Sequence, residues 1–512
     1  MEEWDRVGGS YPSFWFPENV GKTVVYPIGK DDEIVHISSN TIHLTSSTAN
    51  GSLQNIHSRL RTGLYAMLSG RNRGVCGGVM YIYGFGGKVV KAANYSILAQ
   101  RAPSILTLRD AKEHRRRRHR VALALGEDNV RFYEPQMLNH IRTFCAKMVE
   151  GVKNVDGWSA LRNMAPWCNY LLFDIMMSMV FSSDSKLLTH PKYRHIPNAI
   201  HQSSVLQGVL VQDKTLAILG LHKYLFKTAM RERVKFVHFI RTVLGIRLKN
   251  SASYTADSDP CHDVFAYLRN NLSSADLAQL SPKELSAECA TLIIAGSDTS
   301  TMGLAGALFY LSRYRSAYDR LAQEIREKFN DASDIRLGKT LYSCSYLKSC
   351  IQETLRISPP VGTALWREVE PENGATIDGT VIPKGTHVGV GIYSIHHKPN
   401  HFSDPFTFRP ERWLSEARPA DLVNHETRAY GPFSIGPRSC VGKGIAMQEL
   451  MLSLAHIFWS LDFEALGPDG NRVTIEGSVL HPSPGWTEFP MKEYIIAVGD
   501  GPMLRFRRRA VE

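Results

Sequence analysis

Residues 432–444 read PFSIGPRSCVGKG, a glycine-rich loop with one cysteine that runs directly into an apolar helical pattern. A thiolate at the start of a helix is stabilised by the helix dipole and by backbone N–H groups without partners, so Cys440 is placed where a cysteine can act as an ionised metal ligand. Gly436 allows a tight turn, Gly442 allows a flat cofactor to approach the backbone, and Arg438 could reach a cofactor carboxylate. A buried structural thiol would explain the single cysteine equally well.

The spacing of residues within this loop favours Cys440 as a metal ligand over Cys440 as a structural thiol. Phe433, Gly436, Arg438, Cys440 and Gly442 follow the pattern Phe-x-x-Gly-x-Arg-x-Cys-x-Gly. The pattern resembles the signature of the cytochrome P-450 monooxygenases, in which a cysteine thiolate binds haem iron and favours O–O cleavage. The resemblance implies that Cys440 ligates the iron of haem b and that Phe433, Arg438 and Gly442 lie beside the cofactor.

The composition is that of a large globular protein. A chain of 512 residues with 43% hydrophobic content is long enough for one large core or two domains. Its eight cysteines include no Cys-x-x-Cys pair, which argues against a disulfide framework and a zinc site and favours a reducing compartment. The formal net charge of +11 indicates an acidic partner.

The most basic segment is residues 109–120, RDAKEHRRRRHR. A nucleic-acid partner is disfavoured, because no fold signature of a nucleic-acid-binding module accompanies this run. His114 and Arg118 are four residues apart and therefore share one helix face, from which they could hydrogen-bond two carboxylates of a buried cofactor. In the resembled family, side chains at matching positions hold the haem propionates. Residues 115–117 are then left on other faces for a protein partner.

A long apolar helix is predicted to begin at Ser281, which is followed by a proline and, three residues on, by a glutamate. The polar run 295–300, AGSDTS, interrupts its apolar pattern. The Thr299 hydroxyl can bond back to the carbonyl one turn earlier and Gly296 weakens the turn, so a local distortion is predicted. A packing glycine and a buried hydroxyl are the alternative interpretation.

The resemblance gives this polar run a role. In the resembled family, an acid and a threonine in this motif deliver protons during the activation of O2, which implies that role for Asp298 and Thr299. The same resemblance predicts five residues that line the substrate pocket: Ala295, Gly362, Thr363, Ala364 and Leu365.

Three further arginines and one glutamate match elements of the family. Glu353 and Arg356 form an i,i+3 pair on a helix that should end before two prolines, and Arg412 follows later in a Pro-Glu-Arg sequence. The resemblance implies that these three residues form a buried structural network, which would be strongly destabilised by the loss of one partner. It also implies that Arg367 binds a haem propionate.

The N-terminal region is organised differently. Residues 34–37 and 41–44 alternate around Ser-Ser-Asn, which predicts a hairpin. Residues 50–80 are rich in glycine and arginine and follow neither a strand nor a helix period, so we interpret them as a surface loop or, in preference, an insertion. We therefore expect an N-terminal segment with the first β-hairpin (1–49), this insertion or loop (50–80) and a haem domain (81–512).

The sequence shows no evident signal peptide or membrane anchor. The longest apolar window, 287–311, has Asp298 near its centre, where a charge is costly in a membrane, so a buried core helix is predicted. Resemblance to microsomal family members implies the cytosolic face of the endoplasmic reticulum. A soluble cytoplasmic protein is the alternative.

The resemblance implies a mainly α fold with small β-sheets, in a single large triangular domain. It implies a monooxygenase that inserts one oxygen atom of O2 into a lipophilic small molecule, with electrons from NADPH through NADPH-cytochrome P-450 reductase. Residues 391–397 and 501–509 resemble filamentous-fungal, benzoate-hydroxylase-like members, which suggests secondary metabolism. Two alternatives stay open: a haem-thiolate isomerase or dehydratase that does not use O2, and a haem-binding product inactivated by residues 50–80.

Overall fold

The computed structural model divides the chain into two units. Unit 1 comprises residues 1–90, 364–391 and 478–488, and unit 2 comprises residues 91–363, 392–477 and 489–512. The residues described are 24–27, 34–38, 41–43, 65–67, 74–84, 89–99, 102–152, 157–212, 215–251, 263–269, 280–377, 380–414, 428–467, 470–473, 475 and 487–509.

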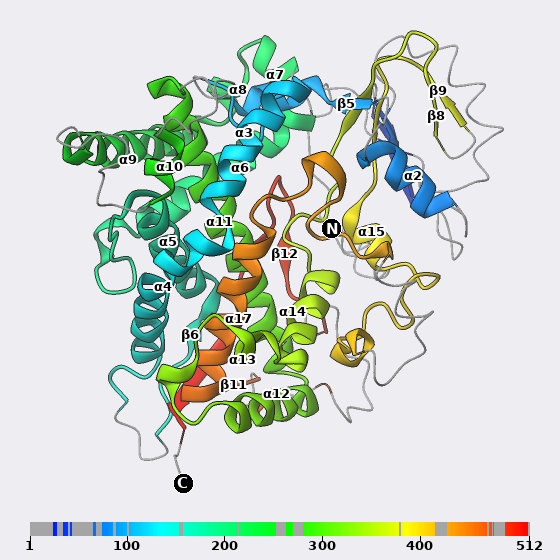
Figure 1. Ribbon diagram of the computed structural model, residues 1–512. Coiled ribbons are helices and arrows are strands. Elements are labelled where there is room, and N and C mark those ends of the chain that lie inside the picture. The colour runs from blue at the N-terminus through cyan, green and yellow to red at the C-terminus, as the bar shows by residue number, and fades with distance from the viewer. Residues whose placement is uncertain are drawn as a thin grey trace. The chain divides into compact units, whose positions relative to one another are not determined.

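Unit 2 is mainly helical (Figure 1). Its α-helices are α3 (Ala111–Ala124), α4 (Glu127–Met148), α5 (Met164–Phe181), α6 (His195–Gln212), α7 (Thr215–Ile218), α8 (His222–Leu225), α9 (Lys227–Ser251), α10 (Val264–Arg269), α11 (Pro282–Leu311), α12 (Arg315–Lys328), α13 (Lys339–Tyr342), α14 (Ser345–Ile357), α15 (Ile392–His396) and α17 (Lys443–Ser460). Its 3-10 helices include η1 (Ala93–Leu98), η2 (Pro191–Tyr193), η4 (Ala332–Asp334), η5 (Pro410–Trp413) and η7 (Gly436–Arg438).

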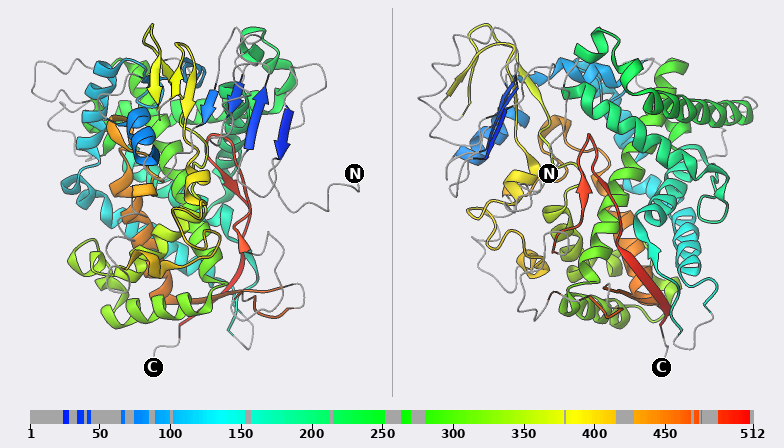
Figure 2. Two further views of the ribbon diagram at one scale, coloured as in Figure 1. Left: turned by 90° about the vertical axis from the view of Figure 1, so that its right-hand side faces the viewer. Right: turned by 180° about the vertical axis from the view of Figure 1, so that it is seen from behind.

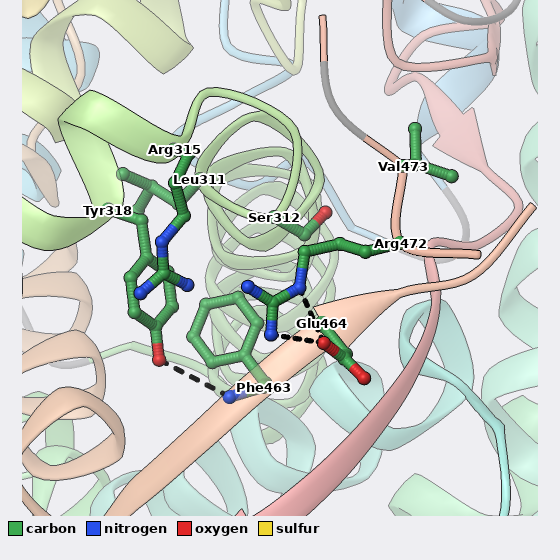
Figure 3. A pocket seen from close by; sticks show the side chains of 8 residues that line it. All are labelled: Leu311, Ser312, Arg315, Tyr318, Phe463, Glu464, Arg472 and Val473. Atoms are coloured by element: carbon green, nitrogen blue, oxygen red, sulfur yellow. Dashed lines mark hydrogen bonds and ion pairs between the residues drawn. The ribbon is translucent and has the colours of Figure 1, made fainter. Parts of the chain in front are cut away.

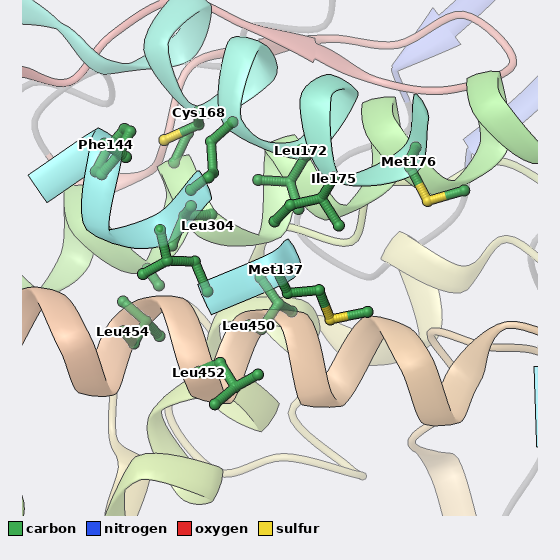
Figure 4. Close-up of a cluster of buried hydrophobic side chains, with 14 of the residues drawn as sticks. Met137, Phe144, Cys168, Leu172, Ile175, Met176, Leu304, Leu450, Leu452 and Leu454 are labelled. Carbon is green, nitrogen blue, oxygen red and sulfur yellow. The ribbon is translucent and has the colours of Figure 1, made fainter. Parts of the chain in front are cut away.

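The core of unit 2 is built around α11. This helix begins as predicted: the Ser281 hydroxyl accepts from the Glu284 N–H at 3.3 Å, and the Glu284 carboxylate accepts from the Ser281 N–H at 2.9 Å, which together form a capping box. Figure 4 shows apolar side chains of α4, α5, α11 and α17 meeting in one cluster. Among the described residues, α5 and α11 are long and apolar enough to span a membrane, yet 78% and 72% of their apolar windows are buried in protein. The predicted core helix at 287–311 is confirmed.

A small residue allows α5 and α11 to pack closely. A Cβ atom at Gly296 would overlap the Sδ atom of Met176 on α5, so only glycine fits there without a shift of the neighbour. Helix α11 continues without interruption from Pro282 to Leu311. The predicted distortion is therefore wrong, and the packing glycine that was the alternative interpretation is what the structure shows.

Unit 2 also contains a three-stranded sheet in the order β11-β14-β6, visible in Figure 2. It consists of β11 (Leu461–Ala465), β14 (Met503–Arg508) and β6 (Arg162–Asn163). The strands are antiparallel, and Phe463 lies opposite Phe506. A separate hairpin pairs β12 (Met491–Lys492) with β13 (Val498–Gly499).

Unit 1 carries most of the remaining strands. An antiparallel sheet contains β1 (Val24–Pro27), β2 (Ile34–Ser38) and β3 (Thr41–His43), and β2 pairs with β3 as the predicted hairpin. A second sheet has the order β4-β10-β7-β5, with bounds Tyr65–Met67, His387–Gly389, Arg367–Val369 and Val89–Lys91. A hairpin pairs β8 (Ala375–Ile377) with β9 (Thr380–Ile382). Together the two units give the predicted class, mainly α with small sheets.

Within residues 50–80 the structure describes two pieces. Strand β4 pairs in parallel with β10, and α2 (Gly74–Tyr83) begins inside the stretch. The expectation that the stretch follows neither a strand nor a helix period is wrong for these pieces. Residues 50–64 and 68–73 lie outside the described residues. The division into residues 1–49, 50–80 and 81–512 stays a prediction.

Candidate functional site

The cysteine loop is closed by its own backbone. The Cys440 N–H donates to the Phe433 carbonyl at 2.8 Å, and the Ser439 N–H donates to the Gly436 carbonyl at 3.0 Å. Gly436 has a φ of 73°, the left-handed conformation that glycine adopts without steric cost, so the predicted tight turn is present. Gly442 then caps the start of α17. The loop therefore presents Cys440 at the N-terminus of a helix.

Cys440 differs from the other cysteines in the described part of the chain, because its side chain is exposed and theirs are buried. Although the side chain is exposed, the protein around it displaces part of the water from the thiol, and this desolvation raises its pKa above the usual value. The N–H groups of Gly442 and Lys443 and the charges of Arg118 and Lys443 lower it. These groups act in the predicted direction, but desolvation outweighs them. A bound metal ion would supply the missing positive charge.

The backbone of Gly442 lies close to the thiol. A Cβ atom at Gly442 would lie 3.9 Å from Cys440 Sγ and 3.7 Å from Ile445 Cγ2, which are ordinary van der Waals distances, so Gly442 holds the backbone next to the sulfur without a side chain of its own. Nowhere in the described residues do three or more His, Cys, Asp or Glu side chains gather as a metal site. A single protein ligand fits a metal that brings its own planar set of ligands, as haem does.

Helix α3 contacts the cysteine loop through arginines. Arg118 donates to the Ser439 carbonyl at 2.5 Å and to the Ser439 hydroxyl at 3.3 Å. Arg438 donates to the carbonyls of Leu108 and Arg109, both at 2.7 Å. His114 is buried in the same helix. The structure therefore places Arg118 beside Ser439, the residue before Cys440, and propionate binding by His114, Arg118 and Arg438 stays a prediction.

One arginine of the basic run has a different position from the one expected. Arg117 is buried and donates to Glu113 at 2.7 Å, to Glu288 at 3.3 Å and to Glu284. It therefore joins α3 to α11, and the expectation that it is available to a partner is wrong, because its charge is neutralised inside the protein. Arg115, in contrast, is exposed.

The polar motif of α11 carries an acid with an altered pKa. Burial raises the pKa of Asp298 to about 7, and hydrogen bonds from Asn169 of α5 and from Ser297 oppose this rise. The Asn169 amide donates to Asp298 Oδ1 at 3.3 Å. The Thr299 hydroxyl donates to the Ala295 carbonyl at 2.7 Å, which is the predicted back-bond. Ala295 is exposed although most of α11 is buried, so this face of the helix is open.

A second acid follows on the neighbouring helix. Glu449 of α17 is buried and accepts a hydrogen bond from the Ser300 hydroxyl at 3.0 Å, and its other oxygen, Oε1, has no hydrogen-bond partner among the described residues. Burial raises its pKa to about 8. The sequence analysis missed Glu449 and also Asn169. A single acid within the apolar run of residues 445–455 is the signal that could have revealed Glu449.

The three residues of the predicted ion network contact one another between α14 and η5. Glu353 and Arg356 of α14 and Arg412 of η5 are fully buried. Glu353 accepts from Arg356 and from Arg412, both at 2.9 Å, and from the Trp413 indole at 3.0 Å. Two arginines and an indole therefore satisfy this carboxylate, and the charges hold its pKa low against the effect of burial.

Comparison with known proteins identifies the family. The profile of the family described as Cytochrome P450 matches residues 83–489. The chain belongs to this family. It is therefore a haem-thiolate oxidoreductase that incorporates oxygen from O2, as the sequence predicted.

The P450 relatives include fungal enzymes. Cytochrome P450 monooxygenase poxM of Penicillium oxalicum is 39% identical over 83% of this chain and 79% of the relative. A cytochrome P450 monooxygenase of Gibberella zeae is 37% identical over 84% of this chain and 97% of the relative. Among solved structures, the P450DA haem domain has a TM-score of 0.67 at 15% identity and covers 94% of this chain and 90% of that one. This last likeness shows the P450 fold.

The remaining predicted residues of the P450 site lie in two places. Arg367, Ala364 and Leu365 belong to unit 1, where Arg367 is buried, donates to the Leu365 carbonyl at 3.1 Å and lies 5.0 Å from the centroid of the Tyr83 ring. Gly362 and Thr363 belong to unit 2. The propionate role of Arg367 and the pocket roles of the others stay predictions.

A separate cavity of about 160 Å³ lies elsewhere in this P450 chain (Figure 3). It is lined by the C-terminal end of α11, by α12, by β11 and by Arg472 and Val473. Glu464 in its wall is already paired with Arg472 and Arg505. The cavity shares no residue with the cysteine loop, and its charged groups are satisfied, so it is not the active site.

Proposed function

We propose that this P450 inserts one oxygen atom of O2 into a lipophilic small molecule of fungal secondary metabolism, with Cys440 as the axial ligand of haem b. The observation that carries the proposal is the exposed Cys440 thiol at the start of α17, two residues before the N-cap Gly442. The monooxygenase names of the fungal relatives support the reaction type.

Haem would supply the activation of O2, and the chain supplies the binding groups and the protons. Arg118, His114 and Arg438 of unit 2 would bind the haem propionates, because guanidinium groups pair well with carboxylates. Arg367 of unit 1 is a further candidate on the family resemblance alone. Asp298, with a pKa of about 7, can hold or release a proton near neutral pH, which suits a general acid. Its bond to Asn169 fixes the direction of the carboxyl group. The neighbouring Thr299 hydroxyl would pass the proton on.

An isomerase or dehydratase that does not use O2 is the alternative function. Such a reaction would have no need of an acid with a pKa near 7 beside a threonine in α11. The presence of both side chains on this helix favours oxygenation. Oxygen consumption coupled to NADPH oxidation in the presence of a substrate separates the two functions.

The electron donor would be an acidic flavoprotein of the NADPH-cytochrome P450 reductase type. Lys112, Arg115 and Lys443 are exposed on α3 and at the start of α17, the two elements that hold and border the cysteine loop. Positive charges in this position would steer an acidic partner towards the haem.

Association with the cytosolic face of the endoplasmic reticulum is supported by an exposed apolar surface. Ile218, Leu219, Tyr224 and Leu225, in and between α7 and α8, are 63–73% exposed. Exposed apolar patches commonly mark membrane or protein contacts. Flotation of the protein with phosphatidylcholine vesicles tests this, and a protein that stays out of the vesicle fraction contradicts it.

The test of haem ligation is the absorption spectrum of the reduced carbonyl complex. Wild-type protein should show the thiolate-type spectrum, and Cys440→Ser should lose it because the serine oxygen is not a thiolate. Cys344→Ser removes a buried thiol and serves as the control, with circular dichroism to verify folding. A thiolate-type spectrum that persists in Cys440→Ser would show that another residue binds the iron.

A further inference from the structure

A half-buried carboxyl group in the β12–β13 hairpin has one enclosed oxygen without a hydrogen-bond partner in the described residues. Glu493 directly follows β12, and its Oε1 atom is enclosed by protein without a hydrogen-bond partner in the described residues. Its carboxyl group lies against Gly362, where an added Cβ would be 2.8 Å from Oε1. Burial raises the pKa of Glu493 to about 7, and the N–H groups of Gly362 and Thr363 oppose the rise. Glu493 thus lies next to Gly362 and Thr363, two residues that were predicted to line the substrate pocket.

The hairpin extends from α11 to α6. At its base, the Gly499 N–H donates to Met302 Sδ at 3.0 Å, and Met302 follows Thr299 by less than one turn of α11. At its tip, Tyr494 packs on α6, because a Cβ at Gly208 would lie 3.3 Å from Tyr494 Cβ. The hairpin therefore contacts α11 close to the proposed proton donors and also contacts α6.

The tip contains a second unsatisfied polar atom. The His201 ring of α6 lies edge-on to Tyr494, with 5.8 Å between the ring centroids. Its Nδ1 atom is enclosed and lacks a hydrogen-bond partner in the described residues. The hairpin and α6, which contact each other through Tyr494, thus each carry one enclosed polar atom, and the hairpin also contains the apolar Ile495 and Ile496.

An enclosed polar atom without a partner costs about 1–3 kcal/mol, so such atoms are rare and call for an explanation. A ligand that donates a hydrogen bond would remove this cost when it binds. We propose that Glu493 is a specificity-determining residue that accepts a hydrogen bond from a hydroxyl or amine group of the substrate. The substrate is then an amphipathic molecule with such a donor, and not a pure hydrocarbon. The inference rests on the proposed function, because it places the substrate of that reaction.

The test uses imidazoles that carry an alkyl chain of about three to twelve carbons ending in either a hydroxyl or a methoxy group. The imidazole binds haem iron and changes its absorption, and the chain places its end group at increasing distances. At one chain length, wild-type protein should bind the hydroxyl probe about tenfold more tightly than the methoxy probe, since only the hydroxyl donates a hydrogen bond.

Two variants and one control read out the role of the carboxyl group. Glu493→Leu should bind both probes equally at every chain length. Glu493→Gln keeps an acceptor oxygen and should retain part of the preference. Glu372→Gln, which changes an exposed acid of unit 1, should behave as wild type. Equal binding of the two probes by wild-type protein at all lengths, or a preference that survives in Glu493→Leu, would overturn the proposal.

Calorimetric titration of the same probe pairs measures the preference without the haem spectrum. A protein that binds no haem would contradict the proposed function, yet the calorimetric comparison of wild type with Glu493→Leu would still decide whether Glu493 selects the hydroxyl probe. A normal haem spectrum with no hydroxyl preference would overturn the role of Glu493 alone.

Discussion

At the scale of single residues, three carboxyl groups have strongly raised pKa values because the protein shields them from water. Burial raises the pKa of Asp298 and of Glu493 to about 7 and that of Glu449 to about 8. Groups with pKa values this close to neutrality can exchange protons at the pH of the cell, which is why they concentrate at functional sites. The three carboxyl groups differ in their hydrogen bonds. Asp298 accepts from the Asn169 amide and Glu449 from the Ser300 hydroxyl, while Oε1 of Glu493 has no hydrogen-bond partner in the described residues.

The proposed proton transfer makes a prediction for Thr299. Thr299→Ala should keep haem and substrate binding but lower the rate of product formation by about 10²–10⁴, because a general-acid relay is lost. NADPH would then be consumed with release of peroxide. Thr301→Ala is the matched control: its hydroxyl makes the same back-bond, to Ser297 at 2.7 Å, but is buried. Product and peroxide are measured against NADPH, and unchanged coupling in Thr299→Ala would assign Thr299 to the core.

Glu449 should make stability depend on pH. Its pKa in the folded state is raised above the ordinary 4.5 to about 8, so the folded protein holds a proton that the unfolded chain releases between these values. The free energy of unfolding should therefore fall as pH rises from about 4.5 to 8, by up to about 1.4 kcal/mol per pH unit from this group.

Glu449→Gln should flatten this part of the dependence, because glutamine does not titrate. Urea unfolding of both proteins at pH 5, 6, 7 and 8 measures it, with the exposed Glu150→Gln as the control. An unchanged slope in Glu449→Gln would show that Glu449 does not carry the proton. Such residues escape sequence reasoning because burial, which shifts their pKa, depends on neighbours from distant parts of the chain.

At the scale of elements, close contact between α5 and α11 holds the proposed proton-donating motif in place. Gly296 allows the contact with Met176, and Asn169 of α5 donates to Asp298. The sequence predicted α11 from its cap and its apolar pattern, which are local signals. It favoured a distortion at Gly296 over a packing role, because the side chain that the glycine packs against lies on another helix.

Gly296→Ala should destabilise the protein by about 1–3 kcal/mol, because the added methyl group overlaps Met176 Sδ and forces a shift in a packed core. Gly245→Ala in α9 is the matched control, since nothing lies within 4 Å of its added Cβ and alanine favours helix. Denaturant midpoints of the two variants measure the contrast. Equal stabilisation by both substitutions would contradict the packing role.

At the scale of the whole molecule, the family and the fold class followed from motifs that occur in order along the chain. The cysteine loop, the α11 motif and the Glu353 network were predicted together, and the match over residues 83–489 confirms the family. Which of the basic side chains are exposed to solvent could not be predicted from motifs in the same way. Arg117 has the same sequence context as its neighbours but is buried between three glutamates, because α11 places Glu284 and Glu288 next to α3.

The burial of Arg117 sharpens the prediction for the electron donor. With Arg117 excluded, Lys112, Arg115 and Lys443 are the exposed charges on the two elements that hold and border the cysteine loop. Arg115→Glu and Lys443→Glu should slow reduction by an acidic flavoprotein, and raising the salt concentration should slow wild-type reduction, because screening shortens the range of attraction to about 10 Å at 0.1 M salt.

Arg508→Glu gives a control with the same change of charge. In the β11–β14 sheet, Arg508 lies opposite Leu461, the residue that directly follows α17. Lys443 is the first residue of this helix, which has 18 residues. The two sites are therefore separated by about 27 Å along the helix, far beyond the screening length. Stopped-flow reduction at several salt concentrations should slow for Arg115→Glu and Lys443→Glu and not for Arg508→Glu. A rate that is insensitive to salt, or equally slowed by all three changes, would place the donor on another surface.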